Sequence, residues 1–379
     1  MAQQLIKNYL TVYPDKARTF IGIGSALVVD GSSLYKDCFI YEADDAKYGA
    51  IDELLLQNVQ IRQHAMYNKM VNGYIVGGKF VEDVDGDHVS HVLDYENLHI
   101  VDLLAVDSVC SLQVLEGGVN LLRRCKPLLW LAALSPNVLD FITALGYKEL
   151  SGGFYYIPEV VENIENNNIF CFWTGTNTMS HNRLGCLYNL RTQTDSNIIL
   201  VTVDNLASFI KPEDPLHEAY QYLSETHKCD YLRVYFMHHY GGGYTDIKSP
   251  RRSWAEAFQQ MRDDPMKIIN GYHEKGEHAI AYKPAAHKWN MLCGNGSYIL
   301  RPRTALTYAW YRAMLDKMDE KVAELRVHPA TRVEDAKEWG GGYPLEWNEM
   351  LGRIFHRVLA DFDGFILYST PKVYGGWYR

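Results

Sequence analysis

The sequence predicts an α/β protein of two domains, and three observations support this prediction. The chain has 379 residues, which is too long for one ordinary domain of about 150 residues. In both halves, short runs of β-branched and aromatic residues alternate with helical stretches, which is typical of α/β domains with mainly parallel sheets. Three consecutive asparagines at 166–168 interrupt this pattern. We therefore expect domains at 1–160 and 169–379, joined by a linker at 161–168.

Composition and charge exclude several classes of protein. With 47% hydrophobic and 22% charged residues, the chain has the composition of a folded protein and not of a disordered or fibrous one. Lys and Arg number 37 against 46 Asp and Glu, a net charge of −9. We therefore expect no broad nucleic-acid-binding surface, although a local cationic pocket is allowed. The 27 Tyr and 8 Trp suit either an aromatic core or pockets for sugars and bases.

The cysteines and the short apolar segments indicate a reducing compartment, the cytoplasm. The seven cysteines are scattered and form no C-x-x-C pair, which is typical of reduced thiols. The longest apolar run, Leu128–Leu134, is far shorter than the roughly 18 residues of a membrane span. We therefore expect a cytoplasmic protein without a membrane span. Nothing in the sequence indicates an oligomeric state.

The first half contains predicted strands that end in glycine or acidic residues. The predicted strands are 19–24, 38–42, 103–107 and 127–134, and the predicted helices are 45–57 and 112–123. Gly22 and Gly24 form part of a G-x-G-x-x-G pattern, with Leu27 at the third glycine position. A phosphate-binding turn and a purely structural turn are therefore both open. Glu42 and Asp107 end two strands, and the carboxyl ends of strands are where an open α/β sheet binds nucleotides.

Residues 103–134, followed by Val138–Tyr147, resemble the FkbM-type S-adenosylmethionine-dependent methyltransferases. The resemblance implies a Rossmann-like domain in which Gly22 and Gly24 lie in the Gly-rich motif and Glu42 holds the cofactor's ribose. Asp107 matches that family's late strand-end aspartate. The chain departs from the family where Gly22 replaces an acidic residue and Val109-Cys110 replaces a Glu-Gly pair. A working methyltransferase and a degenerate structural or interaction domain are both open.

In the second half, the segment from Cys229 predicts a helix that ends at three glycines and turns into a strand over Tyr244–Ile247. Asp230 and Arg233 lie three residues apart and share one helix face. A carboxylate there suits sugar hydroxyls, and a guanidinium suits a diphosphate. The alternative is a solvated ion pair on the helix surface.

This segment resembles the signature of glycosyltransferase family 32 and its capsule-polysaccharide relatives. The matching residues are Asp230, Arg233, Tyr240, Gly241, Gly242, Tyr244 and Asp246. Ile169–Gly175 is similar to the family's first strand, whose aromatic residue stacks near the nucleotide base. The resemblance covers roughly 169–379 and implies a GT-A-type domain. Such a domain transfers a sugar from a UDP- or GDP-sugar to a glycan or other hydroxyl acceptor, with retention of configuration.

The same resemblance assigns roles to particular residues. The catalytic group would contain Asp230, Arg233, Asp246 and Lys248. The residues that would bind the donor are Trp173, Thr174, Gly175, Gly242, Gly243, Tyr244 and Asn295, the last in an acceptor-side loop.

One departure affects the mechanism, because the family's metal-binding Asp-x-Asp pair is here Asp246-Ile-Lys248. An ammonium cannot coordinate Mg²⁺ or Mn²⁺, but it can neutralise a diphosphate. Three interpretations follow: a metal-independent transferase with Lys248 on the phosphates, a transferase in which Asp246 and a distant residue hold the ion, or an inactive relative. Arg251 and Arg252 either extend this cationic pocket or are solvated charges. A non-enzymatic protein for assembly or sugar binding, with both halves degenerate, is a further alternative.

Overall fold

The chain folds into two compact units, Met1–Glu159 and Val160–Arg379, here called unit 1 and unit 2. Helices and strands alternate in both, which confirms the predicted α/β class. In the parts of the chain that the structure describes, no helix combines the length and the apolar character that crossing a membrane requires. This computed structural model describes residues 2–23, 35–41, 59–62, 66–67, 73–76, 79–82, 91–96, 98–107, 111–132 and 134–373.

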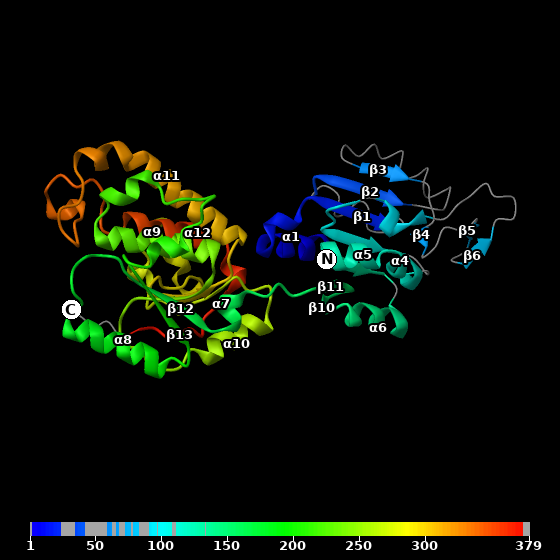
Figure 1. Cartoon of the computed structure of the whole chain (residues 1–379), viewed down its shortest axis with the longest axis horizontal. Helices are drawn as coiled ribbons and strands as arrows, with labels where there is room; N and C mark the ends of the chain where they lie inside the picture. Colours follow the sequence, from blue (N-terminus) through cyan, green and yellow to red (C-terminus); the bar gives the residue numbers. More distant parts are fainter. Residues whose placement is uncertain are drawn as a thin grey trace. The chain divides into compact units, whose positions relative to one another are not determined.

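Unit 1 is built on a seven-stranded sheet in the order β10-β11-β9-β8-β1-β2-β3 (Figure 1). Neighbouring strands from β9 to β3 are parallel, whereas β11 runs antiparallel to β9 and β10. The strand order reverses between β1 and β8. The strands are β1 Thr19–Ile23, β2 Asp37–Tyr41, β3 Val59–Arg62, β8 Leu103–Val106, β9 Leu128–Leu131, β10 Lys148–Ser151 and β11 Phe154–Tyr156.

One face of this sheet packs on helices that follow β8 and β9. Ile21, Leu104 and Leu129 project to this face because side chains alternate along a strand, and they share a core with Leu115 and Ile142. Over the described residues, the strands predicted at 19–24, 38–42, 103–107 and 127–134 are thus confirmed as β1, β2, β8 and β9, of which β9 is shorter than predicted. The helices of unit 1 are α1 Ala2–Val12, α4 Ser111–Gly117, α5 Val119–Cys125 and α6 Pro136–Ala144.

The helix predicted over 112–123 is interrupted in the structure, where α4 and α5 are separated at Gly118. A Cβ added to Gly118 would lie 2.7 Å from Leu93 Cδ2, so the Leu93 side chain would have to shift to accommodate any other residue here. The predicted helix at 45–57 lies outside the described residues. Two short pairs complete the described strands: β4 Met66–Tyr67 with β7 His91–Val92, and β5 Gly73–Val76 with β6 Lys79–Glu82.

Unit 2 contains a six-stranded mixed sheet in the order β13-β12-β14-β16-β15-β17. β12 is parallel to both β13 and β14, and β16 is antiparallel to β14 and β15. The strand expected at the start of Ile169–Gly175 is confirmed as β12. The strands are β12 Asn168–Trp173, β13 Asn197–Thr202, β14 Gly242–Thr245, β15 Ile269–Asn270, β16 Ser297–Leu300 and β17 Ile366–Leu367.

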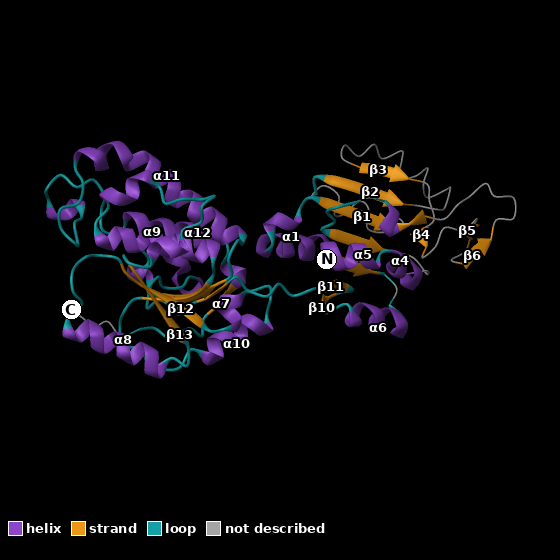
Figure 2. Ribbon diagram, viewed as in Figure 1, coloured by secondary structure: helices purple, strands orange, loops and turns teal. Residues whose placement is uncertain are grey.

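Helices cover both faces of this sheet, with α9, α11 and α12 on one side and α8 and α10 on the other (Figure 2). Side chains of β12 alternate accordingly. Phe170 and Phe172 meet Phe236 of α9, with ring centroids 5.1 and 4.9 Å apart, whereas Ile169 joins a cluster with Phe258 of α10. The helices are α7 Glu162–Glu165, α8 His181–Gln193, α9 Glu225–His239, α10 Ala255–Asp263, α11 Ala305–Val327 and α12 Ile354–Leu359.

The segment 161–168, expected to be a linker, carries helix α7 and begins β12. Ile164 is 1% exposed and joins the core formed with α10. Asn167 has a positive φ of 50°, a conformation that asparagine tolerates better than most residues. The asparagine run therefore makes a tight turn between α7 and β12.

A glycine turn joins α9 to β14. Gly241 and Gly242 have φ values of 61° and 85°, a region that residues with a Cβ rarely adopt. A Cβ on Gly241 would lie 2.5 Å from Pro302 Cδ and 2.8 Å from Leu300 O. Both conformation and space therefore require glycine at this turn.

We expect Gly241→Ala to lower the stability of the protein by about 1–3 kcal/mol, because of the strained φ and the contact with Pro302. Chemical unfolding followed by circular dichroism measures this change. The matched control is Gly185→Ala inside α8, where a Cβ meets nothing within 4 Å and alanine should stabilise by about 0.5–1 kcal/mol. Equal effects of the two substitutions would contradict the role of Gly241.

Candidate functional site

A cavity of about 290 Å³ opens in unit 2 where β12 and β14 end. Because these two strands are parallel, their carboxyl ends lie at the same edge of the sheet, which is where open α/β sheets bind ligands. The cavity is lined by Phe172, Trp173, Thr174, Gly175, Asn177, Arg183, Glu225, Thr226, Cys229, Arg233, Tyr244, Thr245, Asp246, Ile247, Lys248, Val333, Glu334 and Trp347.

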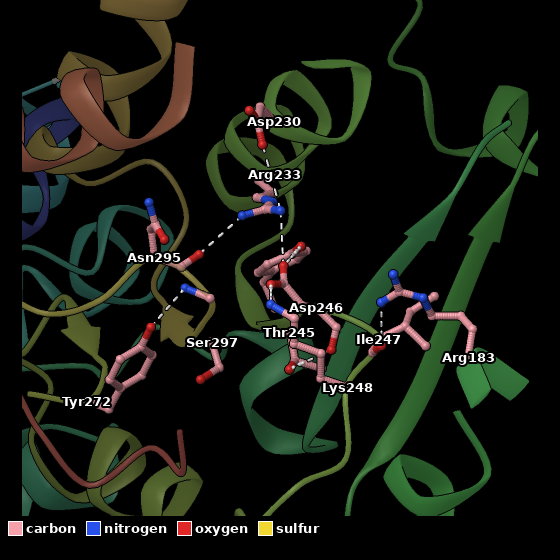
Figure 3. A network of polar contacts seen from close by, with 12 residues as sticks. Arg183, Asp230, Arg233, Thr245, Asp246, Ile247, Lys248, Tyr272, Asn295 and Ser297 are labelled. Atoms are coloured by element: carbon pink, nitrogen blue, oxygen red, sulfur yellow. Dashed lines mark hydrogen bonds and ion pairs between the residues drawn. The ribbon is translucent and has the colours of Figure 1, made fainter. Parts of the chain in front are cut away.

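Asp246 is the centre of a polar network on this cavity wall (Figure 3). Its Oδ1 accepts hydrogen bonds from Arg233 Nη2 at 3.0 Å and from the Tyr244 hydroxyl at 2.7 Å. Its Oδ2 accepts one from Lys248 Nζ at 2.6 Å. One carboxylate is thus held between two cations.

Helix α9 supplies the other half of the network. Arg233 Nη2 lies 3.7 Å from Asp230 Oδ1, so the prediction that these two residues share a helix face is confirmed. Asp230 is 3% exposed, and the alternative of a solvated surface pair is therefore wrong. The Arg233 guanidinium also lies 4.5 Å from the centroid of the Tyr244 ring and donates to Asn295 O at 3.2 Å.

The two carboxyl groups of the network have opposite pKa shifts. Burial alone would raise the pKa of Asp246, but the charges of Arg233 and Lys248 lower it to about 2. Burial raises the pKa of Asp230 to about 7, because the nearby Arg233 offsets burial only in part and Asp246 adds to the rise. Asp246 is therefore ionised at neutral pH, whereas Asp230 changes its charge in the neutral range.

The raised pKa of Asp230 predicts a pH-dependent stability. Below the pKa of the unfolded side chain, about 3.9, the carboxyl is protonated in both states. As the pH rises from there to about 7, the unfolded state loses this proton before the folded state does, so the group's contribution to stability falls. Asp230→Asn cannot ionise, and we expect its stability relative to the parent protein to increase between pH 5 and pH 8.

Urea unfolding at pH 5, 6, 7 and 8 measures this difference. The control is Asp204→Asn, at an exposed position after β13, for which we expect a nearly constant difference. A constant difference for Asp230→Asn as well would contradict the raised pKa.

Residues after β12 form the rim of the cavity. The indole of Trp173 donates to Asn177 O at 2.8 Å, and Thr174 Oγ1 donates to Glu225 Oε2 at 3.5 Å. A Cβ on Gly175 would lie 2.5 Å from Asn177 Oδ1, so glycine allows this loop to fold tightly. The predicted donor-binding residues Trp173, Thr174 and Gly175 therefore do lie together at the cavity.

Three other predicted donor-binding residues lie elsewhere. Among the described residues that line the cavity, Gly242, Gly243 and Asn295 are not found. Gly242 and Gly243 lie at the start of β14, away from its carboxyl end, and a Cβ on Gly243 would lie 2.8 Å from Ile169 Cγ1. Their function in the structure is close packing of the turn and the sheet. Asn295 contributes its backbone oxygen, which holds Arg233.

The predicted cofactor residues of unit 1 are only partly described. Gly24 and Glu42 lie outside the described residues. Gly22 lies inside β1, paired with Ile40 and Ala105, and not in a turn as the glycine pattern suggested. Asp107 follows β8, and its N–H donates to Ile23 O at 2.7 Å.

The sequence did not indicate Arg183 as a cavity residue. It lies in the first turn of α8, its Nη1 donates to Ile247 O at 2.7 Å, and its guanidinium lies 5.7 Å from the Trp173 ring centroid. The signal that could have found it is its position in the helix after a predicted strand, since such first turns border the carboxyl edge of the sheet. Glu334 and Trp347 reach the cavity from the C-terminal segment, which no local pattern indicated.

The side chains around Asp246 suit an anion better than a divalent cation. Mg²⁺ takes oxygen ligands at about 2.0–2.1 Å, but Lys248 Nζ already lies 2.6 Å from Asp246 Oδ2 and would repel a cation on this oxygen. Over the described ranges, no group of three or more His, Cys, Asp or Glu side chains is placed to hold a metal ion. A divalent ion therefore does not fit the donor atoms present at this position.

Comparison with known families agrees with this geometry and indicates a glycosyltransferase-like region in the C-terminal part of the chain. The family model described as "Capsular polysaccharide synthesis protein" matches residues 136–275. This range contains β12, α8, β13, α9 and β14, and therefore most of the cavity wall. No curated protein matches the chain.

Proposed function

We propose that unit 2 is a GT-A-type glycosyltransferase that moves a sugar from a UDP- or GDP-sugar to a hydroxyl group of a glycan or other acceptor. The observation that carries this proposal is the Asp246 carboxyl group, held between Arg233 and Lys248 in a cavity at the carboxyl edge of the sheet. A carboxylate has about four acceptor positions, and three donors contact Asp246. One further donor, a hydroxyl of the ribose or of the sugar, completes this set.

The other cavity residues bind different parts of the nucleotide-sugar donor. Trp173 offers an aromatic surface for the base at the rim, and Arg233, with the buried Asp230 behind it, orients the sugar from α9. In the reaction, the acceptor oxygen bonds to the anomeric carbon, and the bond from that carbon to the diphosphate breaks with its electron pair on the phosphate oxygen. The proton of the hydroxyl group leaves with the diphosphate, and the product retains the anomeric configuration. Fixed charges of this kind accelerate transfer because they need little reorganisation.

Hydrolysis of a panel of UDP- and GDP-sugars by the full chain tests this function. We expect turnover of one donor, and a loss of about 10²-fold or more in Asp246→Asn, because the amide removes the charge that organises Arg233 and Lys248. Asp204→Asn, exposed and outside the cavity lining, is the matched control and should retain activity. The absence of binding and turnover for the whole panel would contradict a glycosyltransferase.

A second proposal concerns unit 1, which we infer to be a Rossmann-like domain that binds S-adenosylmethionine. The supporting observation is the reversal of strand order between β1 and β8, since ligands of open α/β sheets bind at such reversals. Asp107 lies at this point, directly after β8. Its carboxylate would accept hydrogen bonds from the cofactor.

Calorimetric titration of the full chain with S-adenosylmethionine tests this second proposal. We expect saturable binding, weakened about tenfold or more in Asp107→Asn because a charged acceptor is lost. Asp140→Asn, on the exposed part of α6, should bind as the parent does. If the parent protein does not bind the cofactor, unit 1 is a structural domain.

A further inference from the structure

Two cations reach the cavity from different elements, next to the network of Asp246. Lys248 follows β14 and is 21% exposed, while Arg183 comes from the first turn of α8. Arg183 Nη1 donates to Ile247 O at 2.7 Å, which places its guanidinium beside the residue that precedes Lys248. Both side chains line the same cavity.

The position of Arg183 is set by several contacts. The backbone N–H of Arg183 donates to the N-cap residue Ser180 at 3.2 Å, so the helix start holds its main chain. The side chain is held between Ile247 O and the ring of Trp173, 5.7 Å from the ring centroid. A guanidinium that is already ordered loses little conformational freedom when it binds a phosphate oxygen.

The charges around Asp246 favour an anionic ligand. Arg233 and Lys248 both contact this one carboxylate. Burial raises the pKa of Asp230 to about 7, so at neutral pH the second carboxyl of the network is only partly ionised. Glu225 is paired with Lys228 at 2.7 Å, and Glu334 is exposed to solvent. Arg183, Arg233 and Lys248 therefore bring three basic side chains to the cavity wall around the Asp246 carboxylate.

We propose that this cavity binds the diphosphate of its donor through Lys248 and Arg183 and requires no divalent metal ion to do so. The proposal rests on the proposed function of unit 2 and specifies how the anionic part of the ligand is held. An ammonium has three N–H donors, so Lys248 can hold Asp246 and a phosphate oxygen together. Arg183 has five N–H donors, enough for Ile247 O and a second phosphate oxygen.

The test is calorimetric binding of UDP and of GDP to the full chain, in EDTA and then with Mn²⁺ or Mg²⁺. We expect one of the two nucleotides to bind in EDTA, with a Kd that changes less than twofold when the metal is added. Lys248→Ala and Arg183→Ala should each raise this Kd about 10- to 100-fold, the range for a lost charged hydrogen bond. Melting curves of each variant show whether it is folded.

Two further variants sharpen the test. Lys248→Asp places a carboxylate on each side of Ile247, as in the Asp-x-Asp pair. We expect this variant to bind the nucleotide weakly in EDTA and to regain affinity with Mn²⁺. Arg252→Ala is the matched control, because Arg252 is exposed, donates to Ser369 O at 3.0 Å and lies outside the cavity lining. Its Kd should equal that of the parent protein.

The possible failures are distinguishable. If the parent protein binds UDP or GDP only with metal, or if both alanine variants bind as the parent does, the metal-free mode is overturned while the glycosyltransferase proposal stands. If neither nucleotide binds under any condition, the proposed function of unit 2 and the inference that rests on it are both overturned.

Discussion

The ion pair between Arg233 and Asp246 is the interaction on which the candidate site depends. It joins α9 to the end of β14 at 3.0 Å, with the Arg233 side chain only 11% exposed. The same guanidinium packs on Tyr244 and binds Asn295 O, so one side chain connects a helix, a strand and a loop. Removal of one partner would leave a buried charge, a change that typically costs about 3–5 kcal/mol.

The ion pair between Arg233 and Asp246 explains why the cavity is formed before a ligand binds. Asp246 cannot turn away from the cavity wall, because three donors hold its two oxygens. Lys248 is held to the same carboxylate, so its ammonium lies in the cavity before a ligand arrives. Groups fixed in this way need little rearrangement when an anion binds, which is the condition under which charges contribute most to transfer reactions.

Local patterns predicted much of the fold. The strands β1, β2, β8, β9 and β12 are all indicated by short apolar runs, and α9 by an unbroken segment that ends in glycine. Local sequence patterns did not predict helix boundaries that involve contacts between residues far apart in the chain. The predicted helix breaks at Gly118, which packs closely against Leu93, and α7 forms in the expected linker because Ile164 packs on α10.

The sequence by itself predicted that Asp230, Arg233, Asp246 and Lys248 lie close together, because they belong to one helix, turn and strand whose geometry is local. Helical spacing places Asp230 and Arg233 on one face of α9. The glycine turn reverses the chain direction, so that Asp246 and Lys248 lie beside this face. Only the tertiary structure decided that Arg183, Glu334 and Trp347 line the same cavity as Arg233, Asp246 and Lys248, and that Gly242 and Gly243 do not line it. These placements depend on sheet order and on long-range packing, which no spacing of neighbouring residues encodes.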